Sequence, residues 1–504
     1  MGSWRTRGIG RPRGRGGGVT SPDGGRSRSR TGRGDRSRGP ARRTSPVDVA
    51  RQAAYQALSA VRRDDAYANL AVPAILRRMR LHGRDAAFAT ELAYGTLRTG
   101  QTLDAIISVG ADRDVDDIDA SALDALRLGV YQLLYTRVPA HAAVSSTVDL
   151  VRSVTGESAA GFANAVMRQI GARDLETWLD TVAPDAATDP IGHLAVVRNH
   201  PVWITRAFAE ALGGDLDETD RLLAEDNERP IVTLCARPGL VDALDLADST
   251  GGAPGAFSPY AVYLPGGAPA DVPEVADRRA HVQDEGSQLV TLALLDAPLA
   301  DAPTAGPSDT RWLDLCAGPG GKAALLGALA AQSGAEVTAV EIAPHRADLV
   351  AATCAGLPVT VICADGRDVG SHAALPAGGF DRVLVDAPCT GLGALRRRPE
   401  ARWRRTPADL PPLAKLQREL LAAAIRAVRP GGAVGYVTCS PHTAETRVTI
   451  GETVRRSPIP VELIDARPLM PDGMPGLGEE PTVQLWPHRH GTDAMFLAIL
   501  RRTA

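Results

Sequence analysis

The stretch RWLDLCAGPGGK at residues 311–322 decides the fold of the C-terminal half of this chain. Its first part is a short apolar run typical of a buried strand, and Gly318, Gly320 and Gly321 follow as a turn. Glycine allows the backbone to approach a ligand closely, and a helical pattern over 320–332 begins at this turn. The stretch therefore predicts a strand, a turn open to a ligand and the N-terminus of a helix.

The same rhythm continues to the C-terminus. Short apolar runs alternate with helical patterns, and a final strand lies within 494–500. The runs are 336–341, 358–363, 381–387 and 432–438, and the helical patterns are 344–355, 409–429 and 443–455. Strands separated by helices predict a parallel sheet covered on both faces. Residues 281–504 are therefore expected to form a doubly wound α/β domain.

The part before this domain is patterned differently. Residues 45–172 show apolar side chains at three-to-four spacing from Ser45-Pro46 onward, which predicts an all-α domain. The pattern returns in 86–98, 102–109, 120–136, 141–154 and 158–170. Residues 173–280 are of mixed character, with a strand-like run at 231–236, and are expected to form a connecting subdomain.

The N-terminal segment, residues 1–44, is rich in Arg and Gly. Thirteen arginines face Asp23 and Asp35, with almost no apolar side chains, which predicts disorder. Its RGRGGG stretch at 13–18 suits attraction to nucleic-acid phosphate. The alternatives are a tail that only aids solubility, a translation start assigned too far upstream and, ranked lower, an organellar transit segment.

Composition excludes several classes of protein. A chain of 504 residues with 44% hydrophobic content can bury several cores and is not a disordered protein. No apolar run reaches the ~18 residues of a membrane span, and no signal core is present, so we expect a cytoplasmic protein without a membrane partner. The six cysteines form no CxxC pair, which argues against a disulfide scaffold and predicts no metal site.

Acidic residues follow the predicted strands, where doubly wound sheets bind their ligands. Glu341 is placed to accept hydrogen bonds from a ribose, and Asp365 is placed to meet an adenine edge. These residues predict a nucleoside pocket. The turn also fits the dinucleotide pattern GxGxxA, so a nicotinamide cofactor stays possible. A phosphate-binding P-loop is excluded because Ala323 follows Lys322.

Two cysteines follow neighbouring strands of the predicted sheet: Cys389 in DAPCTGLG (386–393) and Cys439 in TCSPH (438–442). A thiolate that adds to carbon 6 of cytosine makes carbon 5 nucleophilic enough to attack a methyl sulfonium. The adduct must then lose a proton and expel the thiolate, so a second proton-handling group is useful. Asp386 could hydrogen-bond the edge of the base.

In this order, DLCAGPGGK, Glu341, Asp365, DAPCTGLG and TCSPH resemble the motifs of S-adenosylmethionine-dependent RNA cytosine-5 methyltransferases, whose catalytic domain is Rossmann-like. VQDEGSQL (282–289) resembles the segment that leads into that core. Residues 125–152 and 161–170 resemble the NusB-type RNA-binding domain, and HPVW (200–203) follows it. Over residues 46–504 the chain is similar to the ribosomal RNA small subunit methyltransferase B family, the Sun/Fmu type.

The resemblance implies an S-adenosylmethionine-binding set that starts at the glycine turn: Cys316, Ala317, Gly318, Pro319, Gly320, Gly321, Lys322, Glu341, Arg346, Asp365 and Asp386. It implies that Cys439 is the nucleophile, that Cys389 assists product release and that Asp386 lies where donor and base meet. The implied partner is 16S ribosomal RNA. Two positions depart from the family pattern: Glu341 replaces Asp, and DAMF (493–496) replaces DGFF.

The loop LRRRPEARWRR (395–405) follows the Cys389 turn and is strongly basic. We expect RNA contacts from Arg396, Arg397, Arg398, Arg402 and Trp403, since arginines bind phosphate and tryptophan stacks on bases. We expect a monomer. Two alternatives remain at this point: a dinucleotide-dependent oxidoreductase, and a catalytically idle RNA-binding protein.

Overall fold

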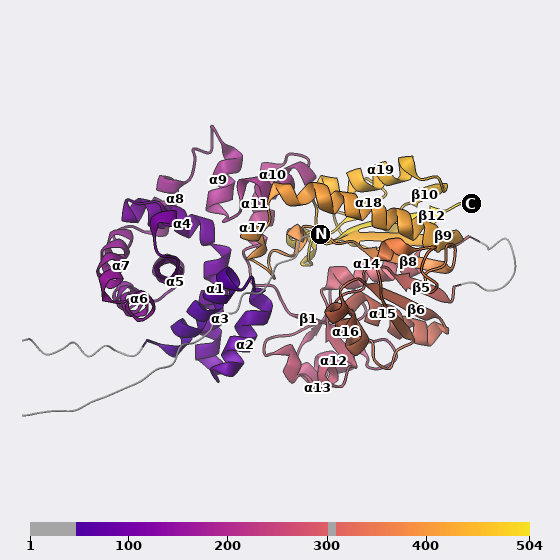
Figure 1. The fold of residues 1–504 in the computed structure, drawn as a ribbon, viewed down its shortest axis with the longest axis horizontal. Helices are drawn as coiled ribbons and strands as arrows, with labels where there is room; N and C mark the ends of the chain where they lie inside the picture. Colours follow the sequence, from indigo (N-terminus) through magenta and orange to yellow (C-terminus); the bar gives the residue numbers. More distant parts are fainter. Residues whose placement is uncertain (1–46, 301–308) are drawn as a thin grey trace, which may run out of the picture. The chain divides into compact units, whose positions relative to one another are not determined.

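The N-terminal part of the described chain is a group of seven α-helices, with α5 at its centre. The computed structural model describes residues 47–300 and 309–504, so the predicted tail lies outside the described residues. The helices are α1 (Val49–Arg63), α2 (Ala68–Arg78), α3 (Gly83–Arg98), α4 (Gly100–Ala111), α5 (Ala120–Tyr135), α6 (Ala140–Thr155) and α7 (Glu157–Ile170). Figure 1 looks down α5, with α4, α6 and α7 around it.

The sequence pattern explains this packing. In α1 the buried side chains Ala53, Ala57 and Val61 recur every four residues, so one face of the helix enters the core. The Asp48 carboxylate accepts a hydrogen bond from the backbone N–H of Arg51 at 3.0 Å and caps the helix. All-helical structure in this region is therefore as predicted.

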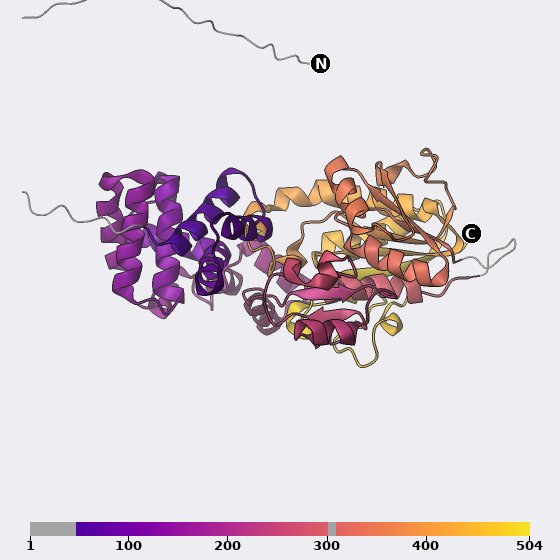
Figure 2. The same ribbon diagram turned by 90° about the horizontal axis from the view of Figure 1, so that it is seen from below.

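The middle region joins four helices to a small sheet. The helices are α8 (Leu175–Val182), α9 (Pro190–Val197), α10 (Val202–Ala211) and α11 (Leu216–Glu225). The sheet has the order β2-β3-β1-β4 and is antiparallel, with β1 (Thr233–Ala236), β2 (Ala253–Pro254), β3 (Ala261–Tyr263) and β4 (Ala280–Val282). Helices α12 (Ala243–Thr250) and α13 (Pro273–Ala276) pack beside it (Figure 2).

The C-terminal domain is built on a sheet of order β10-β12-β9-β8-β5-β6-β7, with β11 paired to β12. The strands are β5 (Arg311–Asp314), β6 (Glu336–Glu341), β7 (Val359–Cys363), β8 (Phe380–Asp386), β9 (Val428–Thr438), β10 (Val461–Ile464), β11 (Val483–Gln484) and β12 (Phe496–Arg502). Strands β5 to β9 are parallel, as predicted. The prediction of a parallel sheet is wrong for the strand expected within 494–500, because this strand, β12, pairs antiparallel with β9. Strands β10 and β11, which the sequence pattern did not predict, also pair antiparallel with β12.

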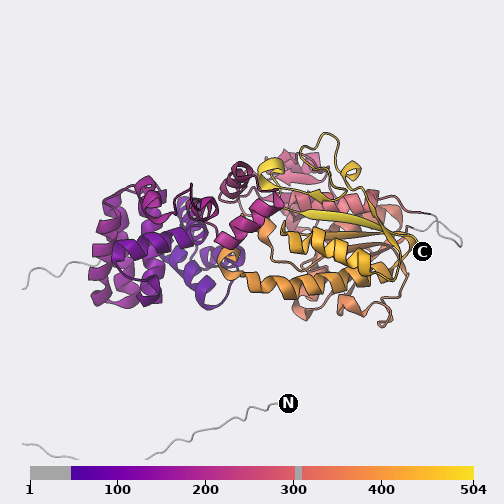
Figure 3. The same cartoon turned by 90° about the horizontal axis from the view of Figure 1, so that it is seen from above.

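Helices cover both faces of this sheet. Val383 and Val385 of β8 pack in the core that contains α18 (Leu410–Ala427) and α19 (Arg447–Arg456). Leu384 between them belongs to the opposite core, with α14 (Glu285–Asp296) and α15 (Gly321–Ser333). The side chains of a strand alternate between the two faces of the sheet, and both faces of β8 are covered by helices. The sequence of β8 is therefore apolar at successive positions. Figure 3 shows α18 and α19 along one face.

No helix in residues 47–300 and 309–504 combines the length and the apolar character needed to cross a membrane.

Candidate active site

The parallel strands bring their carboxyl ends to one edge of the sheet. Asp314 ends β5, Glu341 ends β6 and Asp386 ends β8, while Asp365 follows β7 and Cys439 follows β9. The chain runs from β5 outward to β7 and then crosses to β8 on the other side of β5. Such a reversal of strand order is where doubly wound sheets bind ligands. The structure thus gathers the strand-end residues that the sequence singled out, together with Asp314.

The glycine turn after β5 is built around the Glu341 carboxylate. Arg346, in α16 (Pro344–Thr353), donates to the carbonyl oxygen of Gly318 at 2.7 Å, and its Nη1 lies 3.4 Å from Glu341 Oε2. A Cβ at Gly318 would collide with that carboxylate. A side chain at this position would displace the Glu341 carboxylate and the Arg346 guanidinium, so the turn, Glu341 and Arg346 form one unit.

Asp314 is a member of the site that sequence reasoning missed. Its side chain is fully buried, its Oδ1 accepts from the backbone N–H of Cys316 at 3.3 Å, and its Oδ2 has no hydrogen-bond partner among the described residues. Burial, followed by the nearby Asp386 charge, raises its pKa to about 7. Asp314 could have been identified from its position as the last residue of a strand, because Glu341 holds the same position on the next strand.

Lys322 and Asp386 form an ion pair across the strand ends, with Nζ and Oδ2 2.7 Å apart. Burial on its own would lower the pKa of the Lys322 ammonium, but Asp386, Cys439 and Asp314 outweigh burial and raise it. Lys322 therefore carries a positive charge at neutral pH, next to the thiol of Cys439.

The two predicted thiols meet, with Cys389 Sγ and Cys439 Sγ 3.4 Å apart. The hydrogen bond from Cys389 lowers the pKa of Cys439, with help from Lys322 and Arg398 against burial and Asp386. The same hydrogen bond, together with burial, raises the pKa of Cys389 well above its usual range. Because one sulfur has cations beside it and the other does not, we assign the thiolate to Cys439.

The positive charge near Cys439 does not come from the helix that the sequence suggested. The predicted helix 443–455 begins later, at Arg447, and a 3-10 turn (Thr443–Glu445) precedes it. A helix over 443–455 would have placed its positive N-terminus shortly after Cys439; because α19 begins at Arg447, Lys322 and Arg398 supply the positive charge instead.

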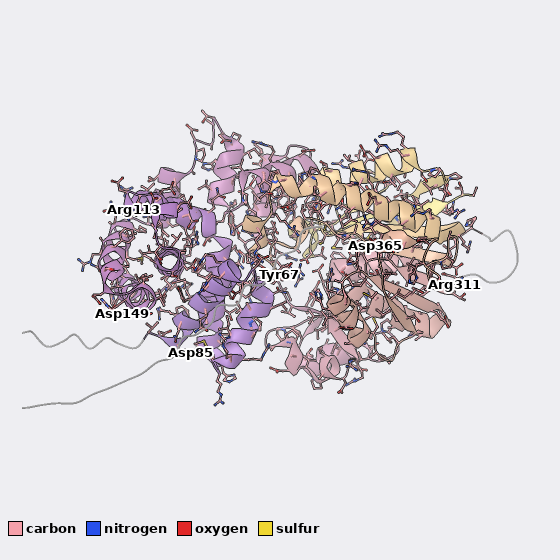
Figure 4. The ribbon with its side chains drawn as sticks, in the orientation of Figure 1. Tyr67, Asp85, Arg113, Asp149, Arg311 and Asp365 are labelled. Carbon is pink, nitrogen blue, oxygen red and sulfur yellow. The ribbon has the colours of Figure 1, made fainter. Side chains whose placement is uncertain are left out.

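Cys316 and Asp365 lie at the same edge with different surroundings. Burial and the neighbouring carboxylates raise the pKa of Cys316 well above its usual range, so it stays a thiol. Asp365 (labelled in Figure 4) forms an ion pair with Arg367 at 2.6 Å, which holds its pKa below the ordinary value. Its contact with adenine remains a prediction.

Arg396 and Arg402 were expected to contact RNA, and this expectation is wrong because both are buried. Arg402 is 0% exposed and donates to Asn227 Oδ1 at 2.7 Å and to the carbonyl oxygens of Asn199 and Asp226 at 3.0 and 2.6 Å. Arg396 donates to the carbonyl oxygen of Gly491 at 2.8 Å. These arginines join parts of the protein to one another.

The other members of the basic loop differ in how far their side chains are already engaged. Arg397 is held between Asp284 and Asp493, and the Trp403 indole donates to the carbonyl oxygen of Leu97 at 2.6 Å. Neither is free for RNA in this arrangement. Arg398 is exposed, and its guanidinium lies 5.5 Å from the ring centroid of Tyr67 (Figure 4). An RNA contact at Arg398 stays a prediction.

Comparison with known proteins agrees with this geometry. A family model described as "16S rRNA methyltransferase RsmB/F" matches residues 304–501, and one described as "NusB family" matches residues 48–172. "Ribosomal RNA small subunit methyltransferase B" of Salmonella paratyphi B is 33% identical over 390 residues, which are 76% of this chain and 84% of the relative. The chain belongs to the 16S rRNA methyltransferase RsmB/F family.

Two further comparisons cover nearly the whole length of this RsmB/F family member. It is 58% identical to the protein named "Putative methyltransferase Rv1407" from Mycobacterium tuberculosis, over 93% of this chain and 99% of the relative. The solved structure of PH0851 superposes with a TM-score of 0.73 at 21% identity, covering 90% of this chain and 98% of that one. The latter likeness concerns the fold.

Proposed function

We propose that this RsmB/F family member transfers the methyl group of S-adenosylmethionine to carbon 5 of a cytosine in 16S ribosomal RNA, through a covalent bond from Cys439 to carbon 6. The observation that carries the proposal is the pair of thiols 3.4 Å apart beside the Lys322–Asp386 ion pair. Family membership and a relative named ribosomal RNA small subunit methyltransferase B support the same reaction.

The residues fit S-adenosylmethionine. Gly318 lets the turn pack directly against the Glu341 carboxylate, Glu341 presents that carboxylate at the end of β6, and the orphaned Oδ2 of Asp314 is a buried acceptor beside them. Ribose hydroxyls and an amino group are suitable donors to these carboxylates. When bound, S-adenosylmethionine supplies an electrophilic methyl group.

The chain's own residues account for the remaining steps. The Cys439 thiolate donates an electron pair to carbon 6 of the base, and the ring electrons move to carbon 5, which then takes the methyl group. Asp386 accepts from Lys322 through one oxygen, so its other oxygen can accept a hydrogen bond from the amino group of cytosine. Uracil has no amino group at this position, so the contact would select cytosine.

Product release needs a proton to leave carbon 5 and the bond from carbon 6 to sulfur to break. The electron pair of the departing proton re-forms the double bond between carbons 5 and 6, and Cys439 leaves as a thiolate. The resemblance assigns this stage to Cys389. Because its raised pKa keeps this thiol protonated at first, it must lose its own proton to solvent; its thiolate then accepts the proton from carbon 5, and Cys389 ends the cycle protonated. The alternative function, a dinucleotide-dependent oxidoreductase, would have no role for two adjacent thiols.

The test uses full-length protein, S-adenosylmethionine and 16S ribosomal RNA. We expect C439A to abolish methylation while S-adenosylmethionine binding persists, and C389A to accumulate a covalent protein–RNA adduct that survives denaturing electrophoresis. C363A is the matched control, since Cys363 is exposed and outside the thiol pair. An adduct in C439A rather than in C389A would reverse the two roles.

A further inference from the structure

A buried carboxylate, Glu445, lies behind the two thiols and has no part in the mechanism so far. It ends the 3-10 turn (Thr443–Glu445), six residues after Cys439, and its side chain is 0% exposed. In the described part of the chain no Arg, Lys or His forms an ion pair with it. A buried carboxylate without a cation costs stability, so its hydrogen bonds must offset that cost.

The hydrogen bonds of Glu445 join the two cysteine-bearing loops. Its Oε1 accepts from the backbone N–H of Thr390 at 2.8 Å and from Gln417 Nε2 at 3.0 Å, and its Oε2 accepts from the Thr390 hydroxyl at 2.5 Å. Thr390 directly follows Cys389. The Thr390 and Ser440 hydroxyl oxygens lie 3.1 Å apart, and Ser440 directly follows Cys439.

Two further contacts make the arrangement rigid. Gln417 Nε2 also donates to the carbonyl oxygen of Pro388 at 2.9 Å, and the Tyr436 hydroxyl donates to the backbone carbonyl oxygen of Glu445 at 2.8 Å. The loops before and after both sulfurs are thus held by one carboxylate and its neighbours. The 3.4 Å between the sulfurs depends on this network.

The charges around the sulfur pair are asymmetric. Lys322, Arg398 and Asp386 act on Cys439, so that side has two cations and one anion. Glu445 acts on Cys389 and adds to the rise in its pKa that the Cys439 hydrogen bond and burial produce first. Tyr436, another titratable group near Cys389, is neutral because burial raises its pKa well above the usual range. His442, which interacts with the Glu445 charge, is also neutral because burial lowers its pKa, although Glu445 and Glu210 act in the other direction.

We propose that Glu445 is a positioning residue that decides which of the two sulfurs is the nucleophile. By holding Thr390 and facing Cys389 with a negative charge, it keeps the proton shared by the pair on Cys389 and leaves the thiolate on Cys439. The importance of this choice of sulfur for methyl transfer rests on the proposed function. The location of the proton does not depend on that function, and it can be measured without RNA.

The experiment is alkylation of full-length protein by iodoacetamide, followed by mass spectrometry of the peptides that carry each cysteine. We expect Cys439 to react at least about tenfold faster than Cys389 near neutral pH, because the thiolate is the reactive form. In E445Q this ratio falls by about threefold or more, since the charge is removed while the shape is kept. In E452Q the ratio stays unchanged, because Glu452 lies on α19 and pairs with Arg418 of α18, outside the network around the thiols.

A second pair of variants covers the case in which E445Q does not fold. T390V keeps the side-chain shape but lacks the hydroxyl that donates to Glu445, so the ratio must fall; T390S keeps the hydroxyl and must preserve the ratio. An unchanged ratio in folded E445Q, or in T390V, would overturn the proposal. If the ratio falls as expected but C389A forms no RNA adduct and the wild-type protein transfers no methyl group to 16S ribosomal RNA, the proposed function fails and this inference stands.

Discussion

At the scale of single residues, the chain offers a matched pair of cations: its two lysines, Lys322 and Lys415. Lys322 is largely buried against Asp386, whereas the Lys415 side chain is 75% exposed and lies 3.9 Å from Glu419 on its own helix. An exposed pair of this kind contributes little, while a buried cation beside a thiol controls ionisation. The contrast between the two lysines makes the role of Lys322 measurable.

We predict that K322Q slows iodoacetamide alkylation of Cys439 by about tenfold near neutral pH. Lys322 lowers the pKa of Cys439, so removing it raises that pKa, and the reaction should then require a higher pH. The measurement is the alkylation rate across a pH series, with K415Q as the control that retains the wild-type profile. A K322Q profile that matches the wild type would assign the activation of Cys439 elsewhere.

At the scale of elements, the segment 396–404 joins the catalytic domain to the helices before it. Arg402 reaches Asn227 and Asp226, the Trp403 indole reaches Leu97, and the Arg404 guanidinium donates to the carbonyl oxygens of Val61 and Ala66 at 2.8 and 2.7 Å. Asp226 is buried, and neither of its carboxylate oxygens has a hydrogen-bond partner among the described residues. Burial raises its pKa to about 6 despite the nearby Arg402.

We predict that R402M destabilises the protein by about 3–5 kcal/mol, since it removes the buried guanidinium that donates to Asn227 and to the carbonyl oxygens of Asn199 and Asp226, and whose positive charge acts on the buried Asp226 carboxylate. The raised pKa of Asp226 means that its protonated form favours folding, so its contribution is full below about pH 4 and is lost as pH rises through about 6. Without Arg402 the pKa rises further. Urea unfolding should therefore show a larger loss near pH 8 than near pH 5.

The control for that variant is R405M, because Arg405 directly follows this segment and no hydrogen bond or ion pair within the described residues joins its side chain to Asp226 or Asn227. We expect its free energy of unfolding to change by no more than about 0.5 kcal/mol. If R402M unfolds at the same urea concentration as the wild type at both pH values, Arg402 and its buried partners do not hold the segment 396–404 in place.

The elements also show what the sequence can and cannot predict. Strand β6 and the strand-end positions of Glu341, Asp386 and Cys439 were predicted, because apolar runs and turns are local signals. The antiparallel pairing of β12 was not, since strand direction is set by partners far away in the chain. The burial of Arg402 was missed for the same reason: its partners lie about 175–200 residues earlier.

Buried carboxylates set a second limit on sequence reasoning. Asp314 and Glu445 are polar residues that local sequence patterns do not mark as functional. The charge of Asp386 at the end of β8 acts on Asp314, and Glu445 binds Thr390 in the loop after β8. Asp314 could have been found as the final residue of a strand. Glu445 could not, because its relation to Cys389 exists only once β8 and β9 pair and place the two cysteine loops together.

At the scale of the whole molecule, charge is divided unevenly. Residues 1–43 hold thirteen arginines and two aspartates, although the whole chain has a formal net charge of −3, so the rest is strongly acidic. The described part also uses many of its arginines internally, as Arg396, Arg397 and Arg402 show. Long-range attraction to RNA phosphate must therefore come chiefly from the N-terminal segment.

We predict that deleting residues 1–44 weakens binding to single-stranded RNA by about tenfold or more at about 50 mM salt and has little effect at about 500 mM. Each phosphate that the shortened protein no longer neutralises makes the slope of log affinity against log salt shallower by about 0.7, so the slope itself reports how many arginines act. Fluorescence anisotropy over a salt series measures it, and a full-length chain with these arginines changed to glutamine is the control for length. Because the site chemistry lies at the sheet edge, methylation at saturating RNA should be unaffected; an unchanged slope would remove the segment from the account of binding.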